Sequence, residues 1–399
     1  MKTRECVKNP EDSPMYRLGR HWNTIQAYLI PGIEDDIGEL GEDLKRFTQT
    51  CELLINDAMF AKYRWCGNGR PPHSRVSLFK AYILKAMRNY PYTTTLIAAI
   101  RESPSIRRLC GWESVSDIPH ESQFSRAFRD FAGDDIGSKA LAACLAENLG
   151  RNGTMHGSHD SSEIVAREKG ATRKKDAAED GKPAETRIER QQRQDESANF
   201  AELPTECDWG CKRNSKGKIE KWKGYKLHLV VGDGDIPLCA FLSSASMHDS
   251  QAMIPMMQRA SASFDYFYDL ADAAYDAAGI KAMSERLGHA PLIDGNPRRG
   301  EKQIDDVGAK FVNIIPAEAL RYRRRTGVER VFGMLKDSHG GCMVRVRGNK
   351  KVFLHLMFGI LVIAALRTIW DIPKSKSTRS TRSTRLPKEV LQLPRHSLL

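Results

Sequence analysis

Residues 322–336 read YRRRTGVERVFGMLK, and two helical patterns run through them. At about 100° per residue, four polar side chains share one narrow arc: Tyr322, Arg325, Glu329 and Lys336. Four apolar side chains recur at intervals of three and four on a second face: Val328, Val331, Phe332 and Leu335. The stretch therefore predicts one helix that packs on its apolar face and presents an acid flanked by cations on the other. A solvated helix surface without further function is the alternative interpretation.

Two more acids stand near predicted strands. Asp272 follows the strand-like stretch 264–271 and precedes a helical pattern over 275–287. Asp160 lies in the sequence His-Asp-Ser-Ser at 159–162, where a first strand is expected. Together with the glutamate of the predicted helix, they give three carboxylates spread along the chain.

These residues carry a resemblance to a known family. The spacing Y-(2)-R-(3)-E-(6)-K over 322–336 resembles the signature of the insertion-sequence DDE transposases, a bacterial superfamily whose last catalytic glutamate lies on such a helix. The sequence Leu-Ala-Asp-Ala-Ala-Tyr-Asp at 270–276 looks like the family's D-x-x-Y-D block, and His-Asp-Ser-Ser at 159–162 looks like its first aspartate. The likeness extends from Gly69 to Trp370.

The resemblance implies an α/β fold with an RNase H-like catalytic domain, a mixed sheet with flanking helices, preceded by an all-α DNA-binding domain. It also implies that Asp160, Asp272 and Glu329 are catalytic and hold two Mg²⁺ or Mn²⁺ ions. Carboxylate oxygens suit these hard ions, and two ions about 3.5–4 Å apart can assist both the attacking and the leaving oxygen of a phosphodiester. The resemblance further implies that Arg325 and Lys336 bind phosphates. Tyr322 is expected to hydrogen-bond or stack nearby, or to pack beneath the helix.

The N-terminal part predicts a helical module with a basic surface. Apolar residues over 76–87 follow helical spacing, and shorter helices are expected at 94–102 and 105–110. In the helix predicted at 122–131, three phenylalanines share one face, whereas Arg126 and Arg129 lie elsewhere on its surface and are candidate DNA contacts. Helix-turn-helix DNA binding is the functional reading of this module, and a helical packing domain with solvated charges is the alternative.

Later residues predict a sheet domain. Alternating residues at 225–231, a Gly-Asp-Gly-Asp turn and residues 236–242 form a predicted hairpin. Asp249 is expected to cap a helix that runs toward Ala260, and 290–293 forms a short strand. The apolar run 352–370 is interrupted by polar residues, so a buried core helix is favoured over a membrane span.

The domain boundaries follow from these patterns. We expect an N-terminal helical segment at 1–58, a helix-turn-helix-like DNA-binding domain at 59–150 and the catalytic domain at 151–371. A polar insertion at 166–205 has as many acids as bases, and it is expected to be exposed with a helical stretch at 187–193. A basic, disordered tail is expected at 372–399.

Charge indicates a polyanionic partner. The 399 residues carry a net charge of +12, and this excess is concentrated in three segments: 62–108, 321–351 and 372–399. DNA is the predicted partner, as the terminal inverted repeats of an element and as target DNA. The resemblance implies a homodimer in the synaptic complex. Neither a membrane nor a nucleotide cofactor is expected, because no span and no phosphate-binding loop is visible.

The predicted activity is DNA transposition, by metal-dependent strand cleavage and strand transfer at the ends of an insertion sequence. Two other functions fit the same residues: an RNase H-like nuclease without strand transfer, and a catalytically silent DNA-binding regulator. Nine scattered cysteines do not form a disulfide framework, which indicates a reducing compartment. A bacterial cytoplasmic location, with nucleoid association on DNA, is therefore expected.

Overall fold

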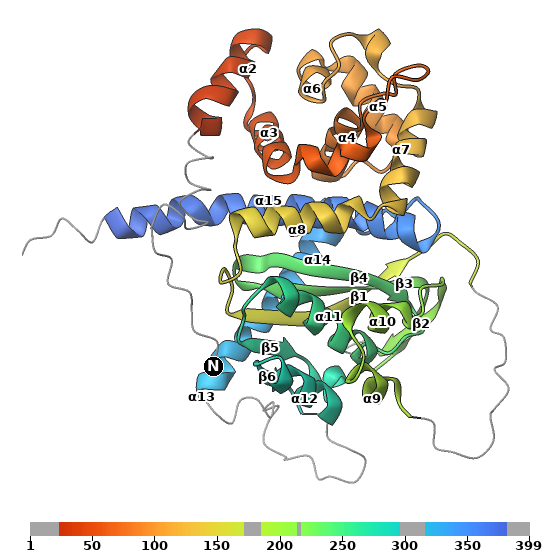
Figure 1. The fold of residues 1–399 in the computed structure, drawn as a ribbon, viewed down its shortest axis with the longest axis vertical. Helices are drawn as coiled ribbons and strands as arrows, with labels where there is room; N and C mark the ends of the chain where they lie inside the picture. The colour runs from red at the N-terminus through yellow and green to blue at the C-terminus, as the bar shows by residue number, and fades with distance from the viewer. Residues whose placement is uncertain (1–23, 171–184, 214–216, 296–315, 381–399) are drawn as a thin grey trace, which may run out of the picture.

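Residues 24–170, 185–213, 217–295 and 316–380 are described in the computed structural model of the chain, with side chains described up to residue 369. Over these residues the chain is a mixed α/β structure. Figure 1 shows the N-terminal helices on one side, a long C-terminal helix across the middle and a sheet with its own helices on the other side.

The described N-terminal part is entirely helical. Its elements follow in the order η2 (Ile25–Leu29), α2 (Ile30–Ile37), α3 (Glu42–Leu54), η3 (Asp57–Tyr63), α4 (Arg75–Met87), α5 (Thr93–Glu102), α6 (Pro104–Leu109), η4 (Val115–Asp117), α7 (Glu121–Gly133) and α8 (Ile136–Asn148). The helices predicted at 76–87, 94–102, 105–110 and 122–131 are confirmed as α4 to α7. Their spaced apolar residues meet in one core, because the rings of Phe79 and Phe131 pack edge-on with centroids 5.8 Å apart.

Among the described residues the sheet has six strands: β1 (His156–Val165), β2 (Asp208–Arg213), β3 (Ile219–Gly232), β4 (Ile236–Ser244), β5 (Tyr268–Ala271) and β6 (Ala290–Ile293). Their order is β2-β3-β1-β5-β6, and β4 pairs with β3. The pairs among β1 to β4 are antiparallel, whereas β1, β5 and β6 run parallel. The hairpin predicted from the alternating residues is confirmed as β3 and β4, joined by η5 (Asp233–Asp235).

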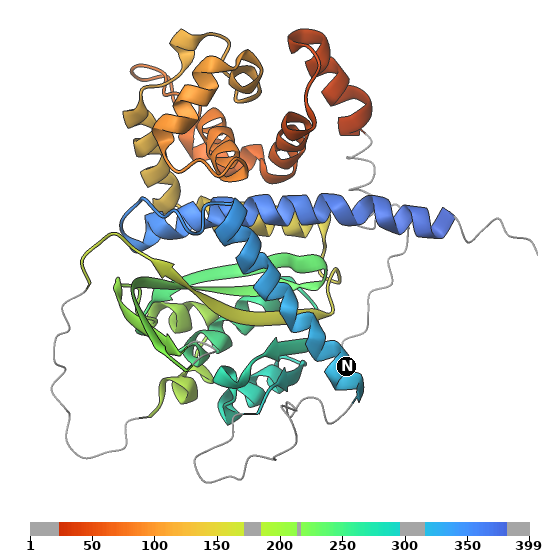
Figure 2. The same ribbon diagram turned by 180° about the vertical axis from the view of Figure 1, so that it is seen from behind.

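Helices cover both faces of the sheet. On one face lie α9 (Arg187–Gln191), α10 (Glu196–Ala201), α11 (Ser250–Ser263), η6 (Ala273–Tyr275) and α12 (Ala278–Arg286). On the other face, α13 (Pro316–Tyr322), η8 (Arg323–Arg325) and α14 (Thr326–Ser338) follow one another, and α14 crosses β1 (Figure 2). Parallel strands joined through helices and buried on both faces are typical of α/β proteins.

The last described helix, α15 (Asn349–Ser380), joins the two halves. It packs against α4, α7 and α8 on one side and against β4 and α14 on the other. Within the described residues, Asn349–Ile369 is the one helix long and apolar enough to cross a membrane, but 78% of that window is buried inside the fold. The stretch is therefore a core helix, as its polar interruptions predict, and its apolar side chains face protein all round.

Three expectations about local structure need correction. Residues 322–336 do not form one helix, because a 3₁₀ turn, η8, separates Tyr322 from α14. The strand at 264–271 is limited to Tyr268–Ala271, and the helix expected at 275–287 begins only at Ala278. Each difference lies at a boundary, where local turns with few sequence signals decide the ends of elements.

The polar insertion is partly docked rather than wholly exposed. The helical stretch predicted at 187–193 is present as α9, and Gln191 is fully buried with its amide donating to the carbonyl of Gln251 on α11 at 2.8 Å. Asn199 of α10 is also fully buried. Hydrogen bonds thus fix this half of the insertion on the sheet domain, although it has few apolar residues.

Two expected segments lie wholly or partly outside the described residues. Residues 171–184 of the insertion and residues 381–399 of the basic tail are not described. The tail was expected to begin at 372, but α15 continues to Ser380.

Candidate active site

Asp160 and Asp272 lie side by side because their strands run parallel. In the pairing of β1 with β5, Ser158 stands opposite Leu270. Each acid lies two residues beyond that pair, and neighbouring strands are about 4.8 Å apart. The two carboxylates therefore project close together just past the point where the parallel pairing ends.

Alternation along β1 directs Asp160 toward η8 and α14. The hydroxyl of Ser158 donates to the carbonyl oxygen of Arg324 at 3.4 Å, whereas the next residue, His159, is buried toward the opposite face. Asp160 lies two residues beyond Ser158, so its side chain points to the same face of the sheet. It faces the helix that carries Glu329.

Arg325 links the first and last of the three predicted acids. One of its guanidinium nitrogens, Nη1, lies 3.7 Å from Asp160 Oδ2, and Nη2 donates to Glu329 Oε1 at 2.5 Å. Burial opposes the charge of Arg325, but the nearby acids outweigh it and raise its pKa. The structure thus gathers Asp160, Asp272, Glu329 and Arg325 at one end of the parallel strand pair.

The carboxyl of Asp160 has an unusual protonation equilibrium. Burial raises its pKa to about 7, and the charges of Asp272 and Asp249 act in the same direction, whereas the Ser161 amide and Arg325 oppose the shift. The effect of burial therefore outweighs that of the nearby guanidinium. Perturbed carboxyls of this kind are concentrated at functional sites.

A buried carboxylate behind the site holds its strands in place. Asp269 of β5 is fully buried and accepts four hydrogen bonds: from His159 Nε2 at 2.9 Å, Tyr266 Oη at 2.9 Å, Ser284 Oγ at 2.6 Å and His289 Nδ1 at 2.8 Å. Although burial opposes its ionisation, these donors hold the pKa of Asp269 far below the usual range. The carboxylate therefore fastens β1 to β5 and to α12 directly behind the two predicted catalytic aspartates.

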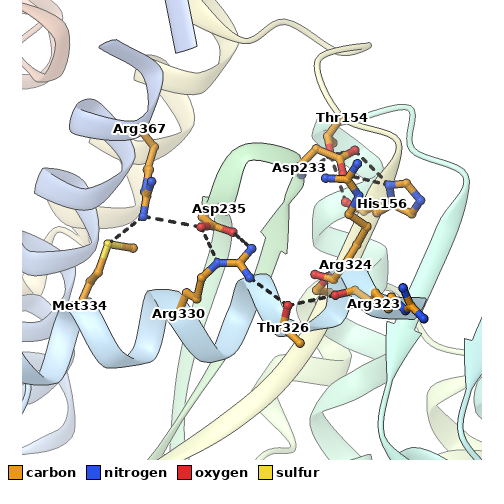
Figure 3. Close-up of polar contacts among 11 residues, drawn as sticks. Thr154, His156, Asp233, Asp235, Arg323, Arg324, Thr326, Arg330, Met334 and Arg367 are labelled. Atoms are coloured by element: carbon orange, nitrogen blue, oxygen red, sulfur yellow. Dashed lines mark hydrogen bonds and ion pairs between the residues drawn. The ribbon is translucent and has the colours of Figure 1, made fainter. Parts of the chain in front are cut away.

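A second set of contacts fixes α14 to the turn of the hairpin (Figure 3). Asp235 of η5 accepts from Arg330 Nε at 2.8 Å and from Arg330 Nη2 at 2.5 Å. Arg330 also donates to Thr326 at 2.9 Å, and Arg367 of α15 lies 3.6 Å from the same aspartate. This bidentate contact fixes the rotation of α14 about its axis. Because Glu329 is the residue before Arg330, the contact also fixes the direction in which Glu329 projects.

Tyr322 packs beneath the site. Only 6% of the residue is exposed, and its ring joins a small cluster with Leu270 and Leu292 of the parallel strands. The guanidinium carbon of Arg325 lies 5.9 Å from the ring centroid. The prediction that Tyr322 shares an arc with three other polar side chains is therefore wrong, because the turn η8 directs Tyr322 into the core. Packing beneath the helix was the other role expected for this residue.

Lys336 lies apart from the three acids. Its ammonium group donates to Glu163 of β1 at 2.8 Å, and Lys212 of β2 reaches the other oxygen of the same carboxylate at 2.9 Å. Burial opposes ionisation of Glu163, but the two lysines lower its pKa to about 2. Lys336 and Lys212 thus bring two positive charges to Glu163. Lys336 lies about two turns beyond Glu329 on α14.

Arg126 and Arg129 belong to a different part of the molecule. Both are exposed on α7, among the helices on the far side of α15 from the sheet (Figure 1). The structure therefore does not bring them together with the acids.

Asp249 lies close enough to Asp160 for its charge to act on that carboxyl, a position that its expected capping role did not predict. It was expected to cap α11, but its side chain makes no capping bond. Instead its Oδ1 accepts from the ammonium of Lys226 on β3 at 2.9 Å, with both side chains largely buried. Its charge contributes to the raised pKa of Asp160. A lysine between the buried residues Tyr225 and Leu227 of β3, at Lys226, is the sequence signal that could have pointed to such a partner.

The donor set suits hard divalent cations. Asp160 in the middle of β1 and Asp272 directly after β5 supply carboxylate oxygens, and burial of Asp160 would be offset by positive charge there. Among the described residues, no three acid, histidine or cysteine side chains are already grouped closely enough to hold an ion. Arg325 stands between Asp160 and Glu329, so a metal site that includes Glu329 requires this guanidinium to move.

Comparison with protein families matches two parts of the chain. Residues 152–365, more than half of the chain, match the family model described as "Transposase DDE domain". Residues 34–130 match one described as "Transposase domain (DUF772)". No curated protein matches the chain.

Proposed function

The chain belongs to the DDE-domain transposases of insertion sequences, and from this we propose that it cuts the terminal inverted repeats of its element and joins them to target DNA. The observation that carries the proposal is the placement of Asp160 and Asp272 two residues beyond the last parallel pair of β1 and β5, with Arg325 on η8 in contact with both Asp160 and Glu329 of α14. Arg325 thus connects two of the three acids, which lie far apart in the sequence.

In this proposal Asp160, Asp272 and Glu329 hold two Mg²⁺ or Mn²⁺ ions. When bound, such ions make water or a 3′-hydroxyl more nucleophilic and stabilise the leaving oxygen. The protein's own residues position the DNA. Arg325, released from the carboxylates, is placed to hold a phosphate beside the scissile bond with its planar fork, and Lys336 can bind a neighbouring phosphate as a point charge.

The rest of the fold supports this division of labour. We propose that the mixed sheet with flanking helices is an RNase H-like domain at 151–371 and that the helices at 59–150, with Arg126 and Arg129 exposed on α7, contact duplex DNA. The described helices before residue 59 precede these two domains, and α15 continues beyond residue 371 to Ser380. Two ends must be held together for transposition, so a homodimer on DNA is part of the proposal.

The test uses purified protein, Mg²⁺, labelled element-end DNA and a supercoiled target. We expect cleaved ends and joined products from the wild-type protein, and neither from Asp160→Asn, Asp272→Asn or Glu329→Gln. These variants should still bind the element end, because each replaces a carboxylate by an isosteric amide. Arg193→Gln, on an exposed stretch of the insertion, is the control and should cut normally.

The results separate three functions. Cleaved DNA without joined products would indicate a nuclease, and specific binding without any cleavage would indicate a regulator. Wild-type cleavage by one of the three acid variants would remove that residue from the site.

A further inference from the structure

Two basic segments that are distant in sequence meet at one cleft. The cleft, of about 560 Å³, lies between the N-terminal helices and the connection from α14 to α15. Its walls come from residues 82–94, from α7 and from residues 339–358. Figure 1 shows this connection beside the lower end of α7. One cation from the basic segment 62–108, Lys85, and three from the basic segment 321–351 thus line the same cleft.

The walls of the cleft are cationic. Four basic side chains line it, against one carboxylate, Glu121: Lys85, Arg345, Arg347 and Lys351. Burial lowers the pKa of Lys85 to about 8, and no carboxylate of the described residues forms an ion pair with it. Desolvation of a cation without an ion-pair partner costs free energy. An anion that enters the cleft would offset this cost by pairing with the charged Lys85.

Aromatic rings form the floor and one wall. Tyr82, Phe128 and Phe358 pack together at the base, and the ring centroid of Tyr82 lies 5.0 Å from that of Phe128 and 5.3 Å from that of Phe358. On the wall, Tyr92 is 49% exposed. The guanidinium carbon of Arg345 lies 5.3 Å from the Tyr92 ring centroid. Ring and guanidinium together offer a flat, positively charged surface.

The connection that closes the cleft is held in a fixed shape. His339 donates a ring N–H to the carbonyl of Ala86 at 3.2 Å, and His355 donates to the carbonyl of Gly340 at 3.0 Å. Gly340 has φ +87°, and a β-carbon there would lie 3.2 Å from the His355 ring, so the turn favours glycine. At the other end the Gly348 amide donates to Glu168 at 3.1 Å. The cleft is therefore preformed.

We propose that this cleft binds a single-stranded segment of the DNA substrate, with a base against Tyr92 and phosphates on Arg345, Arg347 and Lys351. The inference rests on the proposed function and adds to it the form of DNA that is held. Cations alone would serve a duplex equally well. In a duplex the bases are stacked inside the helix, so aromatic rings in a cleft can contact them only when the strand is unpaired.

The test compares binding of two probes by fluorescence anisotropy: labelled oligo(dT) and a hairpin duplex with the same number of phosphates. The variants are Tyr92→Leu and Arg345→Gln, both at exposed positions. Tyr28→Leu is the matched aromatic control, because Tyr28 is 76% exposed and does not line the cleft. Arg193→Gln is the matched cationic control. Thermal melting checks that each variant is folded.

We expect Tyr92→Leu to weaken oligo(dT) binding by roughly 5- to 150-fold, the usual effect of losing one stacked base, and to change duplex binding by less than about twofold. Arg345→Gln should lower the salt dependence of oligo(dT) binding by about 0.7 for the lost phosphate contact. Equal weakening of both probes, or no weakening by either variant, would overturn the inference.

Failure of this inference can be distinguished from failure of the proposed function. If the wild-type protein cleaves element ends but Tyr92→Leu binds oligo(dT) normally, only the inference fails. If oligo(dT) binds through the cleft but no cleavage occurs under any condition, the proposed function fails and the cleft remains a single-strand site.

Discussion

The ring of His159 and the carboxylate of Asp269 are hydrogen-bonded at 2.9 Å inside the sheet, directly behind the candidate active site. His159 immediately precedes Asp160 on β1, and Asp269 lies three residues before Asp272 on β5. The bond therefore joins the two strands that present the predicted catalytic aspartates. Their spacing depends on a buried residue that does not face the substrate.

Asp269→Asn should destabilise the protein strongly. The amide cannot accept from all four donors of the cluster, and breaking a buried charged network by changing one partner costs about 3–5 kcal/mol. Chemical denaturation measures this loss. The control is Asp265→Asn, since Asp265 pairs with Arg151 at the surface at 2.8 Å, where such pairs contribute at most about 1 kcal/mol. Equal losses in the two variants would show that Asp269 has no special structural role.

Much of the fold was predictable because it rests on strong periodicity. The spaced apolar residues of α4 and α7, the alternation of β3 and β4 and the apolar run of α15 each predict the correct element. Their burial provides most of the stabilising contacts. Boundaries were less predictable. The 3₁₀ turn at 323–325 consists of three arginines with no stop signal, yet it decides that Tyr322 faces the core.

The candidate site was predictable only as a set of residue types. The family resemblance of three short sequence blocks singled out Asp160, Asp272 and Glu329, but it does not show that β1 and β5 pair in parallel register. Asp249, Asp269 and Asp235 were missed as supporting residues, because each acts through a partner far away in the sequence. Lys226, His159 and Arg330 become their partners only once the chain folds.

Asp235 and Arg330 should be coupled in stability and in catalysis. Their two-pronged contact orients α14, so a double-mutant cycle with Asp235→Asn and Arg330→Gln should give a coupling free energy of about 1–3 kcal/mol. Both variants should cleave element ends more slowly while binding them normally, because Glu329 is displaced.

The control pair is Glu196 and Arg259, which joins α10 to α11 at 2.7 Å. Glu196→Gln should cost stability but leave cleavage unchanged. Normal cleavage by Arg330→Gln would exclude the positioning role.

Glu163 should give the protein a defined acid sensitivity. Lys212 and Lys336 overcome the effect of burial and lower its folded pKa to about 2, from a reference value of 4.5. A lowered acid pKa stabilises the folded state fully above the unfolded value, and this stabilisation is lost as pH falls through the folded value. The difference in unfolding free energy between wild type and Glu163→Gln should be constant above about pH 5 and shrink between about pH 4.5 and 2.

Urea denaturation at a series of pH values measures this difference. Glu113→Gln is the control, since its side chain is 82% exposed and its loss should change stability by less than about 0.5 kcal/mol at every pH. A difference for Glu163→Gln that stays constant down to pH 2 would contradict the paired carboxylate.

Arg325 should compete with divalent cations for the acids. Its guanidinium lies between Asp160 and Glu329, 3.7 Å and 2.5 Å from their oxygens. Two unit charges about 4 Å apart interact by about 1 kcal/mol in water and more near protein, so Arg325→Gln should lower the Mg²⁺ concentration for half-maximal thermal stabilisation by about fivefold or more. The same variant should lose cleavage, because the phosphate contact is lost.

Arg323→Gln, at an exposed position of the same turn, should behave like wild type, and Glu329→Gln should weaken the Mg²⁺ effect. If Mg²⁺ stabilised wild type and Arg325→Gln at the same concentration, the guanidinium and the metal would not share these oxygens, and Arg325 would be a phosphate ligand only.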